Sequence, residues 1–388
     1  MEEKFYRDSW AEIDLDAIAN NVRELKHRLS EETGVYAVVK ADGYGHGDVQ
    51  VARAALEAGA ERLAVALLDE ALRLRKAGFT APILVMGYTR PEDAAVAAEH
   101  DITVTAYQEE WVDKVEGTGK HPVKVHLKMD TGMGRIGVRT KEEMDGVLSA
   151  IRRNENIELT GVFTHFAKAD DEDLSYYEEQ NRRLEGLLGH FTTQWTKEVT
   201  VHTGNSAASM RFPEQMHHFV RFGISMYGLY PSGDVKKEKP ISLKPAFSLH
   251  SNLVHVKKLE AGESISYGTT YETKGEEWIG TVPLGYADGW IRKLQGAEVL
   301  VDGKRCEIVG RICMDQFMIR LDKSHPVGTE VVLIGKQGED EIETDEIADH
   351  LDTINYEIPC IISSRVPRVY KKGGETTAIS HRLQAPIV

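Results

Sequence analysis

The stretch Gly34-Val35-Tyr36-Ala37-Val38-Val39-Lys40-Ala41-Asp42-Gly43-Tyr44-Gly45-His46-Gly47 joins an apolar run to a lysine and a loop rich in glycine. The run before Lys40 is short, β-branched and bounded by glycine, which predicts a buried strand. A buried strand does not hold a solvated ammonium, so we expect Lys40 where the strand leaves the core. Desolvation disfavours the charged amine, and the neutral amine is the form that attacks a carbonyl or takes up a proton.

Further strand-like runs follow at similar spacing and alternate with segments of helical spacing, such as Val49–Ala58 and Asp69–Lys76. Eight strands alternating with helices in about 200 residues is the pattern of a (β/α)8 barrel, with a doubly wound open sheet as the alternative. The expected strands lie at residues 35–40, 63–67, 83–86, 102–105, 123–128, 159–164, 200–203 and 219–223.

Polar residues stand where these expected strands end. In a (β/α)8 barrel the chemistry collects at the carboxyl ends of the strands, whereas scattered polar core residues would not favour one end. This pattern favours the barrel over the open sheet. The residues concerned are Lys40, Lys128 to Asp130, His165, Asn205 with Ser206, and Arg221.

The composition of the chain changes after Gly233. Residues 236–240 are charged and end in proline, as a connecting segment does. Short alternating runs then follow, separated by turn signals such as Asp302-Gly303. We therefore expect two domains, a (β/α)8 barrel over residues 1–244 and a domain rich in β-strands over residues 245–388.

The overall charge excludes some partners. The 388 residues carry a formal net charge of −15, which argues against nucleic acid or an anionic membrane as a partner. The N-terminus is acidic and lacks the apolar segment of a signal peptide, and no apolar run reaches the roughly 20 residues that span a bilayer. The three cysteines, Cys306, Cys313 and Cys360, lack CxxC spacing, so we expect a cytoplasmic protein without disulfides or a zinc site.

Two segments after the later strands are candidates for holding an anion. Gly204-Asn205-Ser206 opens a helical segment, where free backbone N–H groups and the helix dipole favour phosphate, although a plain N-cap is the alternative. The usual phosphate position in a barrel follows strands seven and eight, which favours the phosphate site and adds the amides of Gly223 and Ile224. Arg221 lies in an otherwise apolar strand, so its guanidinium requires a buried partner, which an ordinary ion pair would also supply.

Motifs along nearly the whole chain resemble those of the pyridoxal phosphate-dependent alanine racemases of fold type III. They are VVKADGYGHG (38–47), LKMDTGMGRIG (127–137), SISYGTTY (264–271), PLGYADG (283–289) and GRICMDQ (310–316). The usual family pattern has Asn-Ala where this chain has Asp42-Gly43. The resemblance implies that Lys40 carries pyridoxal 5'-phosphate and exchanges a proton with one face of Cα.

The resemblance also implies roles for other residues. Arg221 faces the pyridine nitrogen and is held by His202 and His165, while Arg135 contacts the cofactor and the substrate carboxylate. Lys128 is the candidate for a carbamylated lysine. The residues implied to bind the cofactor, besides Lys40, Arg135, His165 and Arg221, are Tyr44, Asn205, Ser206, Gly223, Ile224 and Tyr356.

The same resemblance assigns Tyr267 as the second catalytic base, acting from the partner subunit on the opposite face of Cα. Tyr286 and Met314 then line the substrate site, and the protein is a head-to-tail homodimer with shared active sites. We therefore expect an alanine racemase that supplies D-alanine for cell-wall peptidoglycan synthesis.

Three alternatives remain open at this point. A racemase of serine or another small amino acid differs only in the size of its pocket. A non-catalytic protein that binds pyridoxal phosphate would need neither the second domain nor Tyr267. A related decarboxylase of basic amino acids uses a cysteine as acid, and Cys313 is the residue that suggests it.

Overall fold

The computed structural model describes residues 4–117, 119–381 and 383, and the chain divides into two compact units. The first, here called the barrel unit, comprises Ala17–Gly43 and Asp48–Lys244. The second, here called the β unit, comprises the residues up to Asp16, Tyr44–Gly47 and the residues from Pro245 onward.

The barrel unit contains a closed barrel of parallel strands in which β2 pairs with β3 on one side and with β9 on the other. Its strands are β2 (Gly34–Val38), β3 (Arg62–Val65), β4 (Ile83–Val85), β5 (Ile102–Ala106), β6 (Val123–Lys128), β7 (Ile157–Phe163), β8 (Thr200–His202) and β9 (Phe219–Phe222). All the strands expected from the sequence are present, and the barrel rather than the open sheet is confirmed.

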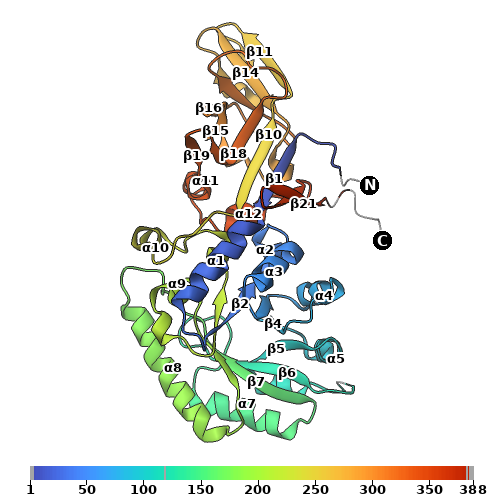
Figure 1. Cartoon of the computed structure of the whole chain (residues 1–388), viewed down its shortest axis with the longest axis vertical. Helices are drawn as coiled ribbons and strands as arrows, with labels where there is room; N and C mark the ends of the chain where they lie inside the picture. Colours follow the sequence, from blue (N-terminus) through green and yellow to red (C-terminus); the bar gives the residue numbers. More distant parts are fainter. Residues whose placement is uncertain (1–3, 118, 382, 384–388) are drawn as a thin grey trace. The chain divides into compact units, whose positions relative to one another are not determined.

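The short apolar runs predicted the barrel well because parallel strands are covered on both faces. Every residue of β2 is buried, and all three residues of β4 are buried too. Such strands read as continuous apolar runs rather than as alternating ones. The helices flank the barrel strands on the outside (Figure 1).

The first helix of the chain is α1 (Leu15–Arg28). In α7 the Thr140 side chain accepts a hydrogen bond from Glu143 N at 3.2 Å, an N-cap that fixes where the helix begins. The other helices as far as residue 244 are α2 (Lys40–Tyr44), α3 (Asp48–Glu57), α4 (Leu68–Lys76), α5 (Ala94–Glu99), α6 (Glu109–Asp113), α7 (Lys141–Arg153), α8 (Ser175–Gln194), α9 (Ser206–Arg211) and α10 (Gly233–Glu238).

The β unit is built on an 11-stranded sheet with the order β11-β14-β17-β16-β15-β18-β10-β1-β20-β21, and β19 pairs with β18. The long strands are β1 (Ser9–Asp14), β10 (Phe247–Asn252), β11 (His255–Leu259), β14 (Glu277–Val282), β15 (Glu298–Val301), β16 (Lys304–Val309), β17 (Phe317–Leu321), β18 (Glu330–Gln337), β20 (Arg368–Lys372) and β21 (Glu375–Ser380). The short elements are β12 (Ser264–Ile265), β13 (Tyr271–Glu272), β19 (Asp340–Ile342), α11 (Thr344–Leu351) and α12 (Glu357–Ile361).

The strand β1 lies in the β unit. The domain boundaries expected from the sequence place it in the barrel of residues 1–244. This strand pairs antiparallel with β10 and parallel with β20. The alternation of buried and less buried residues in β1 is that of a strand covered on one face, which suits this sheet. Sequence position alone does not reveal such a partner, since Glu12 pairs with Ser248 and Val369.

Within the part of the chain that the structure describes, every helix is too short or too polar to cross a membrane.

Candidate active site

The site begins at Lys40, which opens α2 two residues after the end of β2, where the chain leaves the barrel strand as expected from the sequence. Besides burial, the charge of Lys40 lowers the pKa of His165, which is the second residue after β7. Burial and then the charge of Arg221 hold the pKa of His165 well below its ordinary value, and Lys128, Arg135 and Lys40 act in the same direction. His165 is therefore neutral near pH 7. The four basic side chains that act on it, Lys40, Lys128, Arg135 and Arg221, converge on the carboxyl end of the barrel.

Arg221 of β9 is 3% exposed and lies within this group. Its guanidinium donates hydrogen bonds to His202 O at 2.9 Å, Thr164 O at 2.7 Å and Thr203 O at 3.0 Å. Burial lowers the pKa of Arg221 to about 10, so the group remains charged at neutral pH. Carbonyl oxygens at the ends of neighbouring strands thus meet the hydrogen-bonding needs of a charge inside the barrel.

Arg221 also fixes the protonation of two buried histidines. Its Nη1 lies 2.8 Å from His202 Nδ1, and His202 Nε2 lies 2.8 Å from His126 Nδ1. A guanidinium only donates, so His202 Nδ1 accepts and its Nε2–H donates to His126. Burial lowers the pKa of His126 to about 3 and that of His202 well below its ordinary value, so both rings are neutral. Gly161 makes room for this chain, since a Cβ there would lie 2.5 Å from the His126 ring.

Lys128 ends β6 and is 3% exposed. Among the described residues its Nζ has no hydrogen-bond partner, and it lies 4.9 Å from the centre of the Phe163 ring. Burial first, and then the charges of Arg221 and Arg135, lower the pKa of Lys128 to about 7. A buried amine without a partner among the described residues is a candidate for binding a group that the chain itself does not supply.

Arg135 lies in the glycine-rich turn that follows Lys128, and its side chain is exposed. Asp130 shapes this turn, because its Oδ1 accepts hydrogen bonds from Gly132 N at 3.1 Å and Gly134 N at 3.0 Å. These bonds hold the pKa of Asp130 below its ordinary value, although burial acts against them. The turn therefore presents the Arg135 guanidinium close enough to Lys128 for its charge to add to burial in lowering the pKa of that amine.

The predicted phosphate segments meet at Ser206, the first residue of α9. Its Oγ accepts hydrogen bonds from Gly223 N at 3.0 Å and from Ser225 N at 3.5 Å. Asn205 is the N-cap of α9, since its Oδ1 accepts from Ala208 N at 3.0 Å and its Nδ2 donates to Phe166 O at 3.2 Å. Both ends of the Asn205 side chain are thus engaged with backbone, as in the plain N-cap alternative.

Two further predicted residues lie together in the β unit. The ring centres of Tyr44 and Tyr356 are 6.4 Å apart, and Tyr44 is 9% exposed. Burial, with smaller contributions from Tyr356 and Cys360, raises the pKa of Tyr44. Its hydroxyl therefore keeps its proton and can donate a hydrogen bond to an anion.

Tyr267 is exposed in the β unit, with 71% of its surface accessible, at the start of a 3-10 turn (Tyr267–Thr269). The residue before it, Ser266, has a φ of 66°, and its Oγ donates a hydrogen bond to Arg311 O at 2.6 Å. Ser266 Oγ also lies 3.5 Å from Cys313 Sγ. The turn is therefore tied to the 310–316 segment, and the Tyr267 side chain projects into solvent.

Tyr286 and Met314 lie on two loops that are joined by backbone hydrogen bonds. Tyr286 N donates to Cys313 O at 3.1 Å, and Ala287 N donates to Met314 O at 3.0 Å. Gly285 permits this approach, because a Cβ there would lie 2.4 Å from Met314 O. Both side chains are partly accessible, at 41% for Tyr286 and 53% for Met314.

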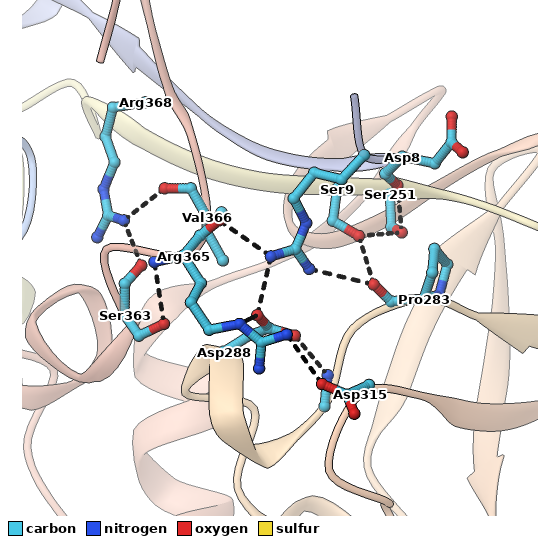
Figure 2. Close-up of polar contacts among 12 residues, drawn as sticks. Asp8, Ser9, Ser251, Pro283, Asp288, Asp315, Ser363, Arg365, Val366 and Arg368 are labelled. Carbon is cyan, nitrogen blue, oxygen red and sulfur yellow. Dashed lines mark hydrogen bonds and ion pairs between the residues drawn. The ribbon is translucent and has the colours of Figure 1, made fainter. Parts of the chain in front are cut away.

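Asp288, which sequence analysis overlooked, anchors these two loops (Figure 2). It is 1% exposed, and its Oδ1 lies 2.8 Å from Arg7 Nη1 and 3.5 Å from Arg365 Nε. Arg365 also pairs with the exposed Asp315 at 2.9 Å. In the sequence Asp288 is a single acid between Ala287 and Gly289. The neighbouring residues do not indicate that its side chain is buried.

We expect Asp288→Ala to lower the free energy of unfolding by about 3 kcal/mol, because it leaves Arg7 without its buried partner. Asp315→Ala is the matched control, since Asp315 is 59% exposed and such a pair is worth less than about 1 kcal/mol. Urea unfolding at one fixed protein concentration measures both changes. Equal effects of the two substitutions would contradict the role of Asp288.

His126 was also missed as part of the site, although it lies two residues before Lys128 on β6. Alternate residues of a strand face the same way, so the His-Leu-Lys order carried this signal. Among the described residues no group of three or more His, Cys, Asp or Glu side chains is arranged to hold a metal ion.

The barrel end fits an anionic group that also has hydrogen-bond acceptors. Its charged donors are Lys40, Arg135 and Arg221, its unpartnered buried amine is Lys128, and Ser206 supplies a hydroxyl. Cations, a hydroxyl and a strand-end lysine are what pyridoxal phosphate requires, with its phosphate, phenolic oxygen and aldehyde.

Comparison with known proteins identifies two family matches that together span most of the chain. Residues 13–231 match the alanine racemase N-terminal domain, and residues 246–370 match the alanine racemase C-terminal domain. The alanine racemase of Geobacillus stearothermophilus is 55% identical over 370 residues, which cover 94% of each chain. The crystal structure of alanine racemase from Bacillus anthracis with bound L-Ala-P superposes with a TM-score of 0.96 at 49% identity, covering 98% of this chain and 99% of that one.

A racemase of another amino acid is also similar in structure. The histidine racemase from Leuconostoc mesenteroides subsp. sake has a TM-score of 0.87 and 30% identity, covering 95% of this chain and 99% of that one. The same fold thus serves more than one amino acid, while the higher identities belong to alanine racemases.

Proposed function

This chain belongs to the alanine racemase family, whose members are pyridoxal phosphate-dependent isomerases, and we propose that Lys40 and Tyr267 carry the two proton transfers of its reaction. Lys40 serves one face of the alanine Cα, and Tyr267 of the partner subunit serves the other. The observation that carries this proposal is the convergence of Lys40, Lys128, Arg135 and Arg221 at one end of the barrel. The 71% exposure of Tyr267 leaves its side chain accessible to another subunit, which supports this proposal.

The cofactor supplies an electron sink that makes the Cα proton of the substrate acidic. Lys40 would hold it covalently, and Arg221 would donate a hydrogen bond to its ring nitrogen. Because Arg221 stays charged and has no acceptor, it gives that nitrogen a hydrogen bond but no proton. By withholding that proton, Arg221 would keep the cofactor a weaker electron sink, which would favour return of the proton to Cα over transamination.

The remaining residues hold the cofactor and the substrate in place. Arg135 would bind the phenolic oxygen of the cofactor and the carboxylate of the substrate, and His165 and His202 contact Arg221 and would hold it in position. Tyr286 and Met314 of the partner subunit limit the space for the substrate side chain. The proposed phosphate ligands are Tyr44, Ser206, Gly223, Ile224 and Tyr356, with Asn205 setting the start of α9.

Lys128 is proposed to carry a carbamate, which would give Arg135 and Arg221 an anionic neighbour. Carbamylation needs a neutral amine, and an ordinary lysine is neutral in only about one molecule in 10³ at pH 7. The pKa of Lys128 is lowered to about 7, so about half of these amines are neutral at that pH. The unpartnered, buried Nζ supports the same proposal.

The lowered pKa predicts how stability depends on pH in bicarbonate-free buffer. Between about pH 7 and the ordinary lysine value of 10.5 the unfolded chain binds more protons at Lys128 than the folded chain. The free energy of unfolding should therefore rise with pH across this interval, by at most about 1.4 kcal/mol per pH unit from this group. Urea unfolding of the wild type and Lys128→Met at several pH values measures it, and equal slopes for both would contradict the prediction.

The experiment that tests the function follows L-alanine in deuterium oxide with purified protein and pyridoxal phosphate. We expect D-alanine that carries deuterium at Cα, because the returned proton comes from groups that exchange with solvent. Serine and histidine are the comparison substrates. Faster conversion of serine would favour the small-amino-acid alternative, and cofactor binding without conversion of any amino acid would favour the non-catalytic one.

The shared site is tested in the same assay by mixing Lys40→Ala and Tyr267→Phe proteins and allowing subunits to exchange. Mixed head-to-tail dimers contain one complete site, so we expect about a quarter of wild-type activity from two nearly inactive proteins. No recovery of activity after demonstrated exchange would contradict the shared site. We further propose that the enzyme supplies D-alanine for peptidoglycan. We also propose that it is cytoplasmic, and the three free cysteines support a reducing compartment.

A further inference from the structure

The turn after Lys40 has a backbone conformation that L-residues rarely adopt. Ala41, Asp42 and Gly43 have φ values of 54°, 52° and 61°, all in the left-handed region. There the Cβ atoms of Ala41 and Asp42 crowd a neighbouring carbonyl oxygen, so each residue adds strain. Such a turn persists only where surrounding groups hold it in place.

Glu70 of α4 holds the first residue of this turn. Its Oε1 accepts a hydrogen bond from Ala41 N at 2.6 Å, and its Oε2 accepts from Ala66 N at 2.8 Å and Leu67 N at 3.1 Å. Ala66 and Leu67 directly follow β3. One carboxylate therefore ties the residue after Lys40 to the end of the adjacent barrel strand, through charge-assisted hydrogen bonds.

Arg73 of α4 holds the second residue of the turn. Its Nη2 lies 3.3 Å from Asp42 Oδ1 and 3.0 Å from Asp48 Oδ1. Asp48 N, at the start of α3, donates to the same Asp42 oxygen at 3.3 Å. Residues three apart share a helix face, so Glu70 and Arg73 reach the turn from one side of α4.

Arg73 also separates two like charges. The Asp48 side chain is 3% exposed, whereas those of Asp42 and Arg73 are about half exposed, at 48% and 55%. Burial raises the pKa of Asp48 to about 6, Arg73 opposes this shift, and the charge of Asp42 adds to it. Without Arg73 the two carboxylates would repel each other across the base of the loop that Lys40 opens.

We propose that Glu70 and Arg73 are positioning residues that fix the left-handed turn after Lys40 and thereby hold the Lys40 amine at the mouth of the barrel. This inference rests on the proposed role of Lys40 as the cofactor lysine. It gives Asp42, one of the two residues that depart from the usual family pattern, a specific partner in this chain.

The test compares the dissociation constant for pyridoxal phosphate, read from the visible absorbance of the lysine-bound cofactor, among matched variants. We expect Arg73→Ala to weaken binding about tenfold, and Asp42→Asn in the same protein to restore it to within about twofold. The asparagine keeps the oxygen that accepts from Asp48 N but removes the charge that repels Asp48. Lys76→Ala is the control, because it removes one positive charge from the last turn of the same helix.

Glu70 is tested in parallel with Glu70→Ala against Asp69→Ala, since both remove an acid from the first turn of α4. We expect Glu70→Ala to weaken cofactor binding by at least about tenfold and Asp69→Ala to leave it within about twofold. The pH midpoint of the visible absorbance should also move in Glu70→Ala, because a displaced Lys40 amine has different charged neighbours. Unfolding midpoints of the cofactor-free proteins show whether a variant has lost its fold instead.

Two results would overturn the inference. One is that Arg73→Ala and Glu70→Ala bind the cofactor as their controls do, and the other is that Asp42→Asn fails to restore Arg73→Ala. The proposed function fails separately, if Lys40→Ala retains the visible absorbance of a lysine-bound cofactor. A signal that depends on Lys40 but not on Glu70 or Arg73 would leave the function standing and reject the positioning role.

Discussion

Lys40→Ala is expected to abolish racemisation of alanine and the visible absorbance of lysine-bound cofactor together. The substitution removes the amine that holds the cofactor and the group that exchanges a proton with one face of Cα. General acid–base catalysis alone contributes about 10²- to 10⁴-fold, so the combined loss should reach at least about 10⁴-fold. Initial rates of D-alanine formation and an absorbance spectrum, taken on the same preparation, measure both effects.

Added methylamine separates the two roles of Lys40, because a small amine in the space left by the side chain can take up a proton but cannot hold the cofactor covalently. We expect partial recovery of activity, while borohydride reduction no longer fixes the cofactor covalently to the chain. Lys76→Ala on the surface helix α4 is the control and should match the wild type. A Lys40→Ala protein with more than a hundredth of the wild-type rate would contradict the assignment.

Tyr267→Phe is expected to lower kcat by about 10²- to 10⁴-fold while the absorbance of bound cofactor stays unchanged. The change removes one hydroxyl from a side chain that is 71% exposed, so the fold and the barrel unit are left intact. Because Lys40 still serves one face, exchange of the Cα hydrogen with solvent should persist for one enantiomer of alanine and disappear for the other. Proton NMR in deuterium oxide distinguishes the two enantiomers when each is supplied alone.

Tyr271→Phe is the matched control for Tyr267→Phe. It also removes one hydroxyl from a tyrosine of the β unit, where Tyr271 donates a hydrogen bond to Glu277 at 2.6 Å. We expect its kcat to stay within about twofold of the wild type. Loss of exchange for both enantiomers in Tyr267→Phe, or for neither, would contradict a role limited to one face.

The sequence by itself determined the barrel and the types of residue at its end. Barrel strands such as β2 and β4 are short runs buried on both faces, so they can be recognised from local composition without knowledge of their partners. Lys40, Lys128, His165, Ser206 and Arg221 could be placed for the same reason, because each stands where such a run ends. The roles assigned to them followed from the motifs and remain proposals.

The tertiary structure alone decided which of these residues meet and in which protonation state. His126 and His202 are 76 positions apart, and only closure of the barrel brings them within 2.8 Å of each other and lets Arg221 orient both. Asp288 pairs with Arg7 across 281 positions. The strand β1 likewise joins the β unit by pairing with β10, which is far from it in the sequence. For Glu70 and Arg73 the sequence predicted only a helical segment, and the packing of α4 beside the turn after Lys40 brings them to Ala41 and Asp42. A sequence pattern shows which side chains avoid water. Pairing between distant residues depends instead on where the folded backbone places them, and the whole chain together determines that placement.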